Sequence, residues 1–258
     1  MAAKGVNLGD FDSVVINQPV GLGDIIFVHG IIDWFVSHGK SVLFPVDPRY
    51  YDAVQRHMAM YGVQYTDFEN YFPFKEYFDS PQFLISSRIL YVPLTFSYLY
   101  FPGCPNNISK YLLLNRPIGD WRSKLKIIRN QQREAKLRKE IHLPHHPYAF
   151  INRTYGTPPN TLKAAFEAEV HPTFTTFELD LNCRFSFTTT PFDYIGLLLE
   201  ASELHLVESS LCYLADYFYP FSENKMHCYD RRTAGESPKY LVPSAFVYRH
   251  PSWIFHPC

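Results

Sequence analysis

The sequence predicts a fold of the α/β class. Short apolar runs that suit buried strands alternate with helical segments through the first half of the chain. The alternation restarts at Tyr148, after the chain-breaking segment Pro144–Pro147, which is the candidate linker between two domains. Hydrophobic residues make up 47% of the 258 residues and charged residues 19%, which favours a folded globular protein with one large core or two modest ones.

The first predicted strand, which begins near Asp12, ends in a glycine turn that carries an aspartate. Gly21 and Gly23 let the backbone turn sharply and let a ligand approach closely. Asp24 then falls in the first turn of a helix, where the helix dipole favours an ionised carboxylate. Open α/β sheets bind ligands at the carboxyl ends of their strands, so Asp24 is a candidate general base. The alternative is a helix cap.

The remaining elements of the first half follow from the apolar runs and the residues that interrupt them. Pro48 suits the first position of a helix. Residues 66–85 are rich in aromatic side chains and lack periodicity, so we expect an irregular loop there. Basic residues between Arg129 and Lys139 are expected to form a solvated helix face. The expected elements are helix 24–38, strand 41–46, helix 49–61, strands 63–65 and 89–94, and helix 120–142.

In the second half, one predicted strand runs directly into a group of polar residues. Strand 204–207 is followed by Glu208, Ser209 and Ser210 at the start of the next helix. The two hydroxyls and the free backbone N–H groups of a helix start make an anion site. The Glu208 carboxylate is an acceptor for hydrogen bonds from ribose or sugar hydroxyls. The alternative is that the serines only cap the helix.

A second polar segment, Asn152–Thr157, follows the predicted strand 148–152. The Arg153 guanidinium can bind a diphosphate bidentately, and Asn152 and Thr157 flank it. The alternative is a surface-loop arginine. Further strands are expected near 174–179 and before Arg231, whose side chain is expected to be solvated.

Several functional classes lack their signals. The net charge of −1 argues against a nucleic-acid surface that acts by bulk electrostatics. The fingerprints of dinucleotide-binding folds, P-loops and serine hydrolases do not occur. The Asp10-Phe11-Asp12 match to a metal-binding Asp-x-Asp pattern precedes the first strand and lacks the required context. We expect neither a metal nor a cofactor.

The chain is expected to be cytoplasmic and to have no transmembrane segment. The first nine residues lack the basic start and apolar run of a signal peptide. The apolar stretch 24–36 is too short and too interrupted to span a bilayer. The five cysteines include no Cys-x-x-Cys pair and suit thiols in a reducing compartment.

The Gly21–Asp24 turn and the Glu208–Asp216 segment resemble the GT-B glycosyltransferases, particularly the heptosyltransferase-like group. In that group, an early Gly-Asp turn carries the catalytic base. An acidic residue followed by small hydroxyl residues or glycine holds the nucleotide-sugar. Both motifs stand here in that order, near the two ends of the chain, although Glu208 replaces the more common Asp.

The resemblance implies two Rossmann-like domains that face a cleft, in a compact GT-B architecture. Residues 1–143 would form the acceptor domain and residues 144–240 the nucleotide-sugar domain, with a tail at 241–258 returning toward the first domain. Asp24 would be the catalytic base, and Gly21 and Gly23 would form the acceptor-side turn. The residues that would bind the donor are Asn152, Arg153, Thr157, Glu208, Ser209 and Ser210.

The expected activity is therefore transfer of a sugar from a nucleotide-diphosphate sugar to a hydroxyl acceptor in glycan biosynthesis. The resemblance implies an inverting, metal-independent reaction and leaves hexosyl, pentosyl and heptosyl transfer open. One alternative is a non-catalytic carbohydrate-binding or scaffolding protein that keeps the fold. A second alternative is a sugar-nucleotide epimerase, which needs no acceptor. The presence of both Asp24 and the phosphate motif favours the enzyme.

Overall fold

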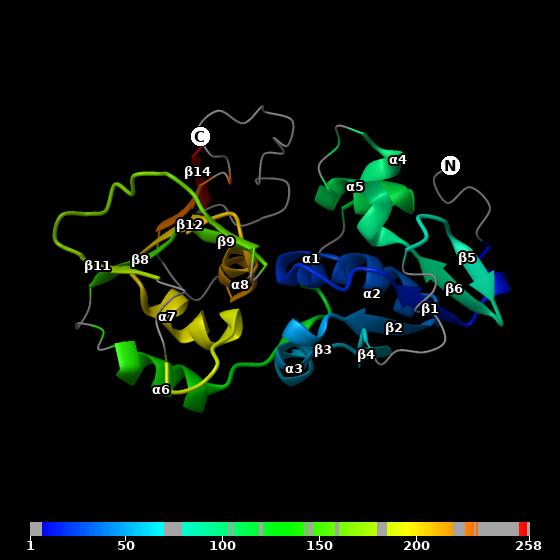
Figure 1. The fold of residues 1–258 in the computed structure, drawn as a ribbon, viewed down its shortest axis with the longest axis horizontal. Coiled ribbons are helices and arrows are strands. Elements are labelled where there is room, and N and C mark those ends of the chain that lie inside the picture. The colour runs from blue at the N-terminus through cyan, green and yellow to red at the C-terminus, as the bar shows by residue number, and fades with distance from the viewer. Residues whose placement is uncertain are drawn as a thin grey trace. The chain divides into compact units, whose positions relative to one another are not determined.

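A computed structural model describes residues 7–69, 79–102, 104, 106–118, 121–141, 143, 147–157, 160–179, 185–218, 225–229, 231 and 253–256. Contacts divide the chain into two compact units, Met1–Ile128 and Arg129–Cys258, and each unit has a five-stranded sheet (Figure 1). The α/β class predicted from the sequence is therefore confirmed. Within the described ranges, no helix combines the length and the apolar character that a membrane crossing requires.

The sheet of the first unit is mostly parallel, and its strand order reverses beside β1. The chain proceeds from β1 to β2 and β4 on one side, whereas β6 pairs with β1 on the other side. The edge strand β5 runs antiparallel to β6. Open α/β sheets bind ligands beyond the carboxyl ends of their strands at such a reversal. The spatial order is β4 (Val63–Asp67), β2 (Ser41–Val46), β1 (Ser13–Ile16), β6 (Ile89–Val92) and β5 (Leu84–Ser86).

The core of the first unit lies around β1, where Val14, Val15 and Ile16 are fully buried. Helices α2 and α3 both pack against β2. The helices are η1 (Leu8–Asp10), α1 (Leu22–Phe27), α2 (His29–Ser37), α3 (Pro48–His57), η3 (Leu94–Phe96), α4 (Ser97–Tyr100) and α5 (Asn106–Leu113). A short antiparallel pair consists of β3 (Met58–Ala59) and β7 (Lys126–Ile127).

The helix predicted after the glycine turn is in fact two helices, α1 and α2, with a break at Val28. The cause is Tyr111 of α5, whose hydroxyl donates a hydrogen bond to the Phe27 carbonyl at 2.9 Å. In an unbroken helix, that carbonyl would accept from the amide of Ile31, which instead donates to the Val28 carbonyl at 2.9 Å. Gly30 permits the approach, because a Cβ at this position would clash with the Tyr111 hydroxyl.

Two other predictions for the first unit have clear outcomes. Pro48 is the first residue of α3, as predicted, and Asp47 caps that helix by accepting from the Arg49 amide at 2.9 Å. The loop predicted over 66–85 includes the end of β4 and the start of the edge strand β5, and its residues 70–78 lie outside the described part of the chain.

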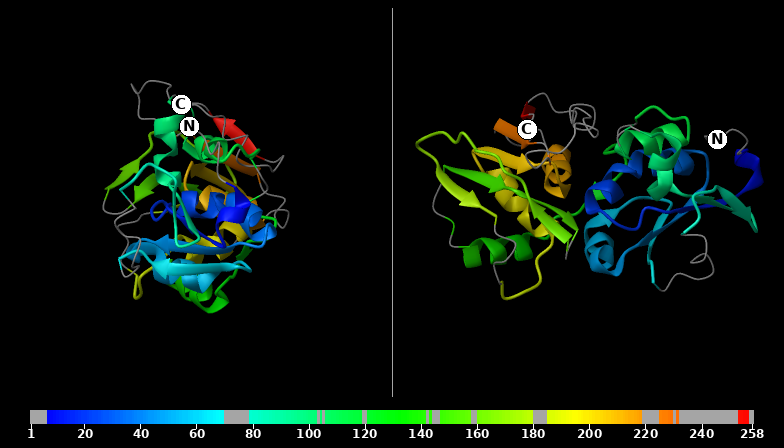
Figure 2. Two further views of the ribbon diagram at one scale, coloured as in Figure 1. Left: turned by 90° about the vertical axis from the view of Figure 1, so that its right-hand side faces the viewer. Right: turned by 45° about the horizontal axis from the view of Figure 1, so that its top comes forward.

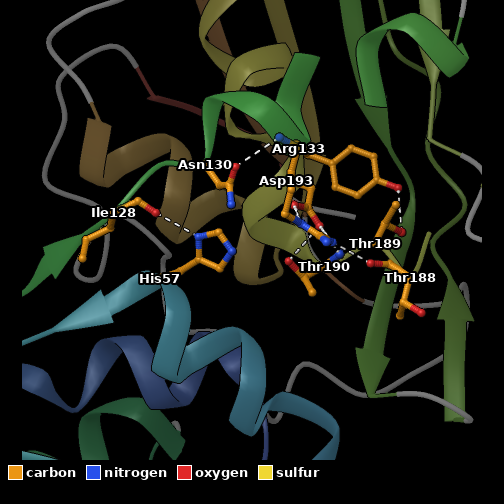
Figure 3. A network of polar contacts seen from close by, with 9 residues as sticks. His57, Ile128, Asn130, Arg133, Thr188, Thr189, Thr190 and Asp193 are labelled. Carbon is orange, nitrogen blue, oxygen red and sulfur yellow. Dashed lines mark hydrogen bonds and ion pairs between the residues drawn. The ribbon is translucent and has the colours of Figure 1, made fainter. Parts of the chain in front are cut away.

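The helix predicted over 120–142 is wrong in its first half. It begins at Gln131, and the preceding segment contains β7. The cause is His57, which forms two hydrogen bonds with the backbone of Ile128, directly after β7. The His57 carbonyl accepts from the Ile128 amide at 2.7 Å, and the His57 Nδ1 donates to the Ile128 carbonyl at 2.8 Å (Figure 3). These partners, 71 residues apart, hold the segment extended.

The sheet of the second unit is parallel throughout and also reverses its order, beside β8. The chain passes from β8 to β11 on one side and then to β12 and β13 on the other. Every residue of β8 is buried. The spatial order is β11 (Thr175–Glu178), β8 (Tyr148–Asn152), β12 (Glu203–Val207), β13 (Lys225–Tyr229) and β14 (Trp253–His256).

Helices of the second unit pack on one another and on this sheet. Helix α6 contacts α7 and η4, and α8 contacts β12. These contacts place α6 in the second unit, whereas the sequence-based division placed residues up to 143 in the first domain. The helices are α6 (Gln131–Ile141), η4 (Pro191–Tyr194), α7 (Ile195–Glu200) and α8 (Ser210–Phe218).

The basic face of α6 was predicted to be solvated, and this prediction is wrong for Arg133. Arg133 donates to both carboxylate oxygens of the buried Asp193 at 2.6 and 2.9 Å, and to the Thr188 carbonyl at 2.7 Å (Figure 3). Thr190 adds a backbone donor to Asp193 at 2.7 Å. Although burial raises the pKa of Asp193, these bonds hold it below its ordinary value. Arg133 therefore anchors α6 to η4.

Two features of the second unit had no predicted counterpart. Strands β9 (Thr154–Thr157) and β10 (Asn160–Lys163) form a separate antiparallel hairpin, visible beside the five-stranded sheet (Figure 2). The tail was expected to return toward the first domain, but its described residues form β14, which pairs in parallel with β13 of the second sheet. The rest of 241–258 lies outside the described residues.

Acidification is expected to destabilise the first unit through the buried His29. Its Nδ1 donates to the Ile25 carbonyl at 2.8 Å, so its Nε2 accepts the hydrogen bond from the Tyr65 hydroxyl at 2.7 Å. Burial lowers the pKa of His29 from 6.5 to about 4. The unfolded chain therefore binds a proton first as the pH falls. Stability contributed by the neutral ring is complete above pH 6.5 and is lost as the pH falls toward 4, by about 3 kcal/mol in total.

Urea unfolding between pH 7.5 and 4.5 measures this loss, with His29→Gln as the reference that lacks the titrating ring. We expect the free energy of unfolding of the wild type to fall more steeply with decreasing pH than that of the variant. Other histidines titrate in both proteins and cancel in the difference. Parallel pH profiles for the two proteins would contradict the assignment.

Candidate functional site

Asp24 stands where the sequence predicted it, in the first turn of α1 directly after β1. The sharp turn is made by Gly21, which has a φ of 79° and is the N-cap of α1. The positive φ favours glycine at this position, and a Cβ here would also lie 2.9 Å from the Asp24 Oδ2. Gly23 is the second residue of α1. The turn therefore brings the Asp24 carboxylate close to the backbone of Gly21.

The partner of Asp24 is a lysine that the sequence reasoning missed. Lys110 of α5 donates from Nζ to Asp24 Oδ1 at 2.5 Å. The Lys110 side chain is 0% exposed, whereas that of Asp24 is 29% exposed. An ammonium is rarely buried unless it is paired. Here it is paired with a carboxylate that is partly exposed, which makes this position a candidate functional site. The two residues are 86 positions apart, and no local motif links them.

At the reversal point of the first sheet, hydrogen bonds join the segments that follow β1 and β6. Thr95, after β6, donates from its amide and its hydroxyl to the Asn17 carbonyl, after β1, at 2.9 and 3.0 Å. The Gln18 side chain is 3% exposed and donates to the Val20 carbonyl at 2.8 Å. Its Oε1 has no hydrogen-bond partner among the residues that the structure describes. A buried amide oxygen thus lies in the turn that leads to Asp24.

In the second unit, two residues predicted to bind the donor meet at the reversal point of the sheet. The Asn152 Nδ2, at the end of β8, lies 3.4 Å from the Ser209 Oγ, after β12. Both side chains are buried. Asn152 also bonds the Thr154 backbone through both ends of its amide, at 3.0 and 3.1 Å. Asn152 therefore shapes the turn after β8 and links it to the turn after β12 (an Asx turn).

Arg231 joins this edge of the sheet beside Glu208. The Arg231 Nε donates to the Glu208 carbonyl at 2.6 Å and lies 4.0 Å from the Glu208 carboxylate. Its side chain is 48% exposed, so the predicted solvation is correct for much of it. The Glu208 amide in turn donates to the Tyr229 carbonyl at 2.9 Å. Because β8, β12 and β13 are parallel, these residues follow strand ends at the same edge of the sheet.

Arg153 is held in place from two sides. Its Nε lies 3.2 Å from Glu178 Oε1, at the end of β11, and Lys163 reaches the same oxygen at 3.2 Å. Its guanidinium carbon lies 4.5 Å from the centre of the Phe166 ring. Phe166 is stacked on Tyr229 with ring centres 3.8 Å apart. The guanidinium plane is thus supported by an aromatic pair, and its fork carries more N–H donors than Glu178 uses.

The last two predicted residues stand at the ends of their elements. Ser210 is the first residue of α8 and Thr157 the last residue of β9. The Thr157 side chain lies outside the described part of the structure.

A group of stacked rings lies beyond Arg153 on the same sheet. His205, His227 and His256 come from β12, β13 and β14, with neighbouring ring centres 4.4 and 5.1 Å apart. The His227 Nδ1 and the His256 Nε2 share a hydrogen bond of 2.8 Å, so one of these nitrogens must be unprotonated. Burial lowers the pKa of His205. In the part of the chain that the structure describes, no three acidic, histidine or cysteine side chains are placed as metal ligands.

Three solved structures similar to this chain are glycosyltransferases. A family 9 glycosyl transferase from Veillonella parvula has a TM-score of 0.52 at 8% identity, over 96% of this chain and 86% of that one. The iron-containing dodecameric glycosyltransferase TibC from enterotoxigenic E. coli has a TM-score of 0.44 at 12% identity, over 96% and 63%. The heptosyltransferase TibC in complex with ADP-D-β-D-heptose has a TM-score of 0.45 at 13% identity, with the same coverage.

No protein-family model matches the sequence, and a search of curated proteins found no similar chain. The likeness to the Veillonella protein shows that this chain has the fold of a family 9 glycosyltransferase. In fold, this confirms the resemblance to heptosyltransferase-like enzymes that the two sequence motifs indicated.

Proposed function

We propose that this protein is a glycosyltransferase that moves a sugar from a nucleotide-diphosphate sugar to a hydroxyl acceptor. The observation that carries the proposal is the meeting of Asn152 and Ser209 at the reversal point of the second sheet. Ligands of open α/β sheets bind at such points, and the fold is that of a family 9 glycosyltransferase. The protein would act in the cytoplasm.

The second unit would bind the donor through its phosphates. Arg153 and Arg231 flank the reversal point, and Ser209 and Ser210 supply hydroxyls and backbone N–H groups at the start of α8. Glu208 would accept hydrogen bonds from sugar or ribose hydroxyls. Two guanidinium groups and a helix start can balance the charge that develops on a departing diphosphate. We therefore propose a reaction that needs no metal.

The first unit would supply the base. Asp24 would take the proton of an acceptor hydroxyl as the oxygen of that hydroxyl forms a bond to the anomeric carbon of the donor sugar. The bond between that carbon and the diphosphate oxygen breaks, and its electron pair leaves with the nucleotide diphosphate. A single displacement of this kind inverts the anomeric centre. Asp24 ends protonated and returns its proton to water.

A non-catalytic sugar-binding protein remains the second candidate, and one contact favours it. The ion pair of Asp24 with a buried lysine is also what a structural anchor between α1 and α5 would contain. Loss of transfer on replacement of Asp24 separates the two candidates.

A nucleoside diphosphate is expected to raise the melting temperature of the protein. A ligand that binds only the folded state stabilises it by mass action, by about 2.7 kcal/mol at a hundred times its Kd. For a protein of this size we expect a shift of roughly 5 °C or more. Thermal unfolding with millimolar UDP, GDP, ADP and CDP, each in the presence of a metal chelator, measures the effect.

The matching nucleosides at the same concentrations are the control for this experiment. They should shift the transition less, since the proposed contacts are made to the phosphates. If all four diphosphates leave the transition unmoved, the donor site is refuted. If binding appears only when a divalent cation is added, the metal-independent reaction is refuted.

A further inference from the structure

Lys110 is the most deeply buried cation that the structure describes near the candidate base. Its side chain is 0% exposed, and its Nζ reaches Asp24 Oδ1 at 2.5 Å. The residues on both sides of it are also fixed. Ser109 shares a buried hydrogen bond of 2.7 Å with Ser97, and Tyr111 donates to the Phe27 carbonyl at 2.9 Å. Hydrogen bonds on both sides of Lys110 thus fix the part of α5 that carries the ammonium.

Stability alone is a poor explanation for this pair. Removing an ammonium from water is costly, and apolar residues of similar volume usually stabilise a core as well as a buried ion pair does. Tyr111 already joins α5 to the end of α1. Lys110 differs from Tyr111 in that it binds the Asp24 carboxylate. The Asp24 side chain stays 29% exposed, while its Oδ1 accepts a hydrogen bond from the buried ammonium.

The two carboxylate oxygens consequently have different surroundings. Oδ1 is bonded to Lys110, whereas Oδ2 lies over Gly21, where even a Cβ would come within 2.9 Å. The hydrogen bond from Lys110 therefore restricts the orientation of this carboxylate. A general base must meet the proton it abstracts at hydrogen-bond distance, and a misplacement of about 1 Å is enough to cost up to a hundredfold in rate.

We propose that Lys110 is a positioning residue that binds Oδ1 of Asp24 and so presents Oδ2 to the acceptor hydroxyl. This inference rests on the proposed glycosyltransferase function. It adds a residue that touches neither the donor nor the acceptor and that acts through Asp24. The proton passes from the acceptor oxygen to Oδ2, and Lys110 keeps its own protons throughout.

The test compares Lys110→Met with Lys124→Met. Met keeps an unbranched side chain and removes the charge. Lys124 pairs with Asp33 at 2.8 Å in the same unit, and its side chain is 54% exposed, so its replacement removes an ammonium–aspartate pair away from Asp24 without emptying a buried position. For Lys110→Met we expect a kcat about tenfold lower, with the KM for acceptor and the Kd for nucleotide diphosphate within threefold of wild type. Lys124→Met should transfer sugar at the wild-type rate.

A double-mutant cycle with Asp24→Asn separates positioning from general support of the fold. If Lys110 acts through Asp24, the double variant transfers no more slowly than Asp24→Asn alone. Multiplied losses in the double variant would overturn the proposal, and so would a kcat loss in Lys110→Met that equals its unfolded fraction. A wild-type kcat in Lys110→Met would overturn it as well.

A second measurement needs no transferase activity. Carbodiimide-mediated coupling of an amine to Asp24, followed by mass spectrometry of the folded protein, reports how freely the carboxylate moves and reacts. Lys110→Met should raise the coupling rate at Asp24 several-fold, and Lys124→Met should leave that rate unchanged. If the wild type binds no nucleotide diphosphate and transfers no sugar, the proposed function fails. The coupling rate then decides the role of Lys110, and an unchanged rate at Asp24 overturns it.

Discussion

Replacement of Asp24 by asparagine is expected to slow sugar transfer by about a hundredfold or more, the usual scale for loss of a general base. An amide can still accept the hydrogen bond from Lys110, so the variant should fold, but it cannot take the proton of a hydroxyl. The proposed donor residues belong to the second unit, so the Kd for nucleotide diphosphate should stay close to that of the wild type. Steady-state kinetics with the donor identified by thermal shift, together with calorimetry, measures both.

The buried ammonium of Lys110 makes a stability control necessary for this variant. Asparagine leaves that charge without its counter-charge, which lowers the free energy of unfolding. Asp24→Asn should therefore also be examined together with Lys110→Met, where no buried charge remains. A slow but stable double variant assigns the loss to the missing base. Wild-type turnover in Asp24→Asn would return Asp24 to the role of helix cap and favour the non-catalytic candidate.

Replacement of Arg153 by alanine is expected to weaken binding of a nucleotide diphosphate by about 10- to 100-fold, because a charge-assisted hydrogen bond to phosphate contributes on the order of 1.5–3 kcal/mol. Binding of the free nucleoside should change little. Replacement of both Ser209 and Ser210 by alanine should have the same selectivity. Titration calorimetry with a nucleoside and its diphosphate decides this for each variant.

Lys163→Ala is the matched control for Arg153→Ala. Both cations contact the same oxygen of Glu178 at 3.2 Å, but Lys163 is 70% exposed and lies on the β10 strand of the hairpin. Loss of Lys163 should leave both affinities near those of the wild type. Equal losses for nucleoside and diphosphate in Arg153→Ala would mean that Arg153 supports the fold, through Glu178 and Phe166, and does not touch the phosphates.

The places of Asp24 and Ser210 at the starts of helices could be predicted, but the partners of the candidate residues could not. A buried strand followed by glycine and aspartate, or by glutamate and two serines, is a local pattern, and both segments stand where the sequence placed them. Lys110 lies in a helix without a motif, and its meeting with Asp24 depends on how α5 packs on α1. In the same way, Glu178 reaches Arg153 only because β11 pairs with β8.

The fold shows the same division between local and distant causes. Strands with continuous apolar runs, such as β1 and β12, were predicted within a residue or two. The β9–β10 hairpin was missed because its residues are mostly polar and do not alternate between apolar and polar side chains. The helix predicted from Asp120 failed because the bonds between His57 and Ile128 impose an extended backbone that local preference does not reveal.

The way in which the two sheets are assembled bears on the order of events during synthesis. The strands of the first sheet come from residues 13–92, and those of the second come from residues 148–256, so neither sheet borrows a described strand from the other. The first sheet can therefore close while the second is still being translated, as domains generally do when they fold as units from the N-terminal end. All five of its strands have then been synthesised before β8 begins at Tyr148.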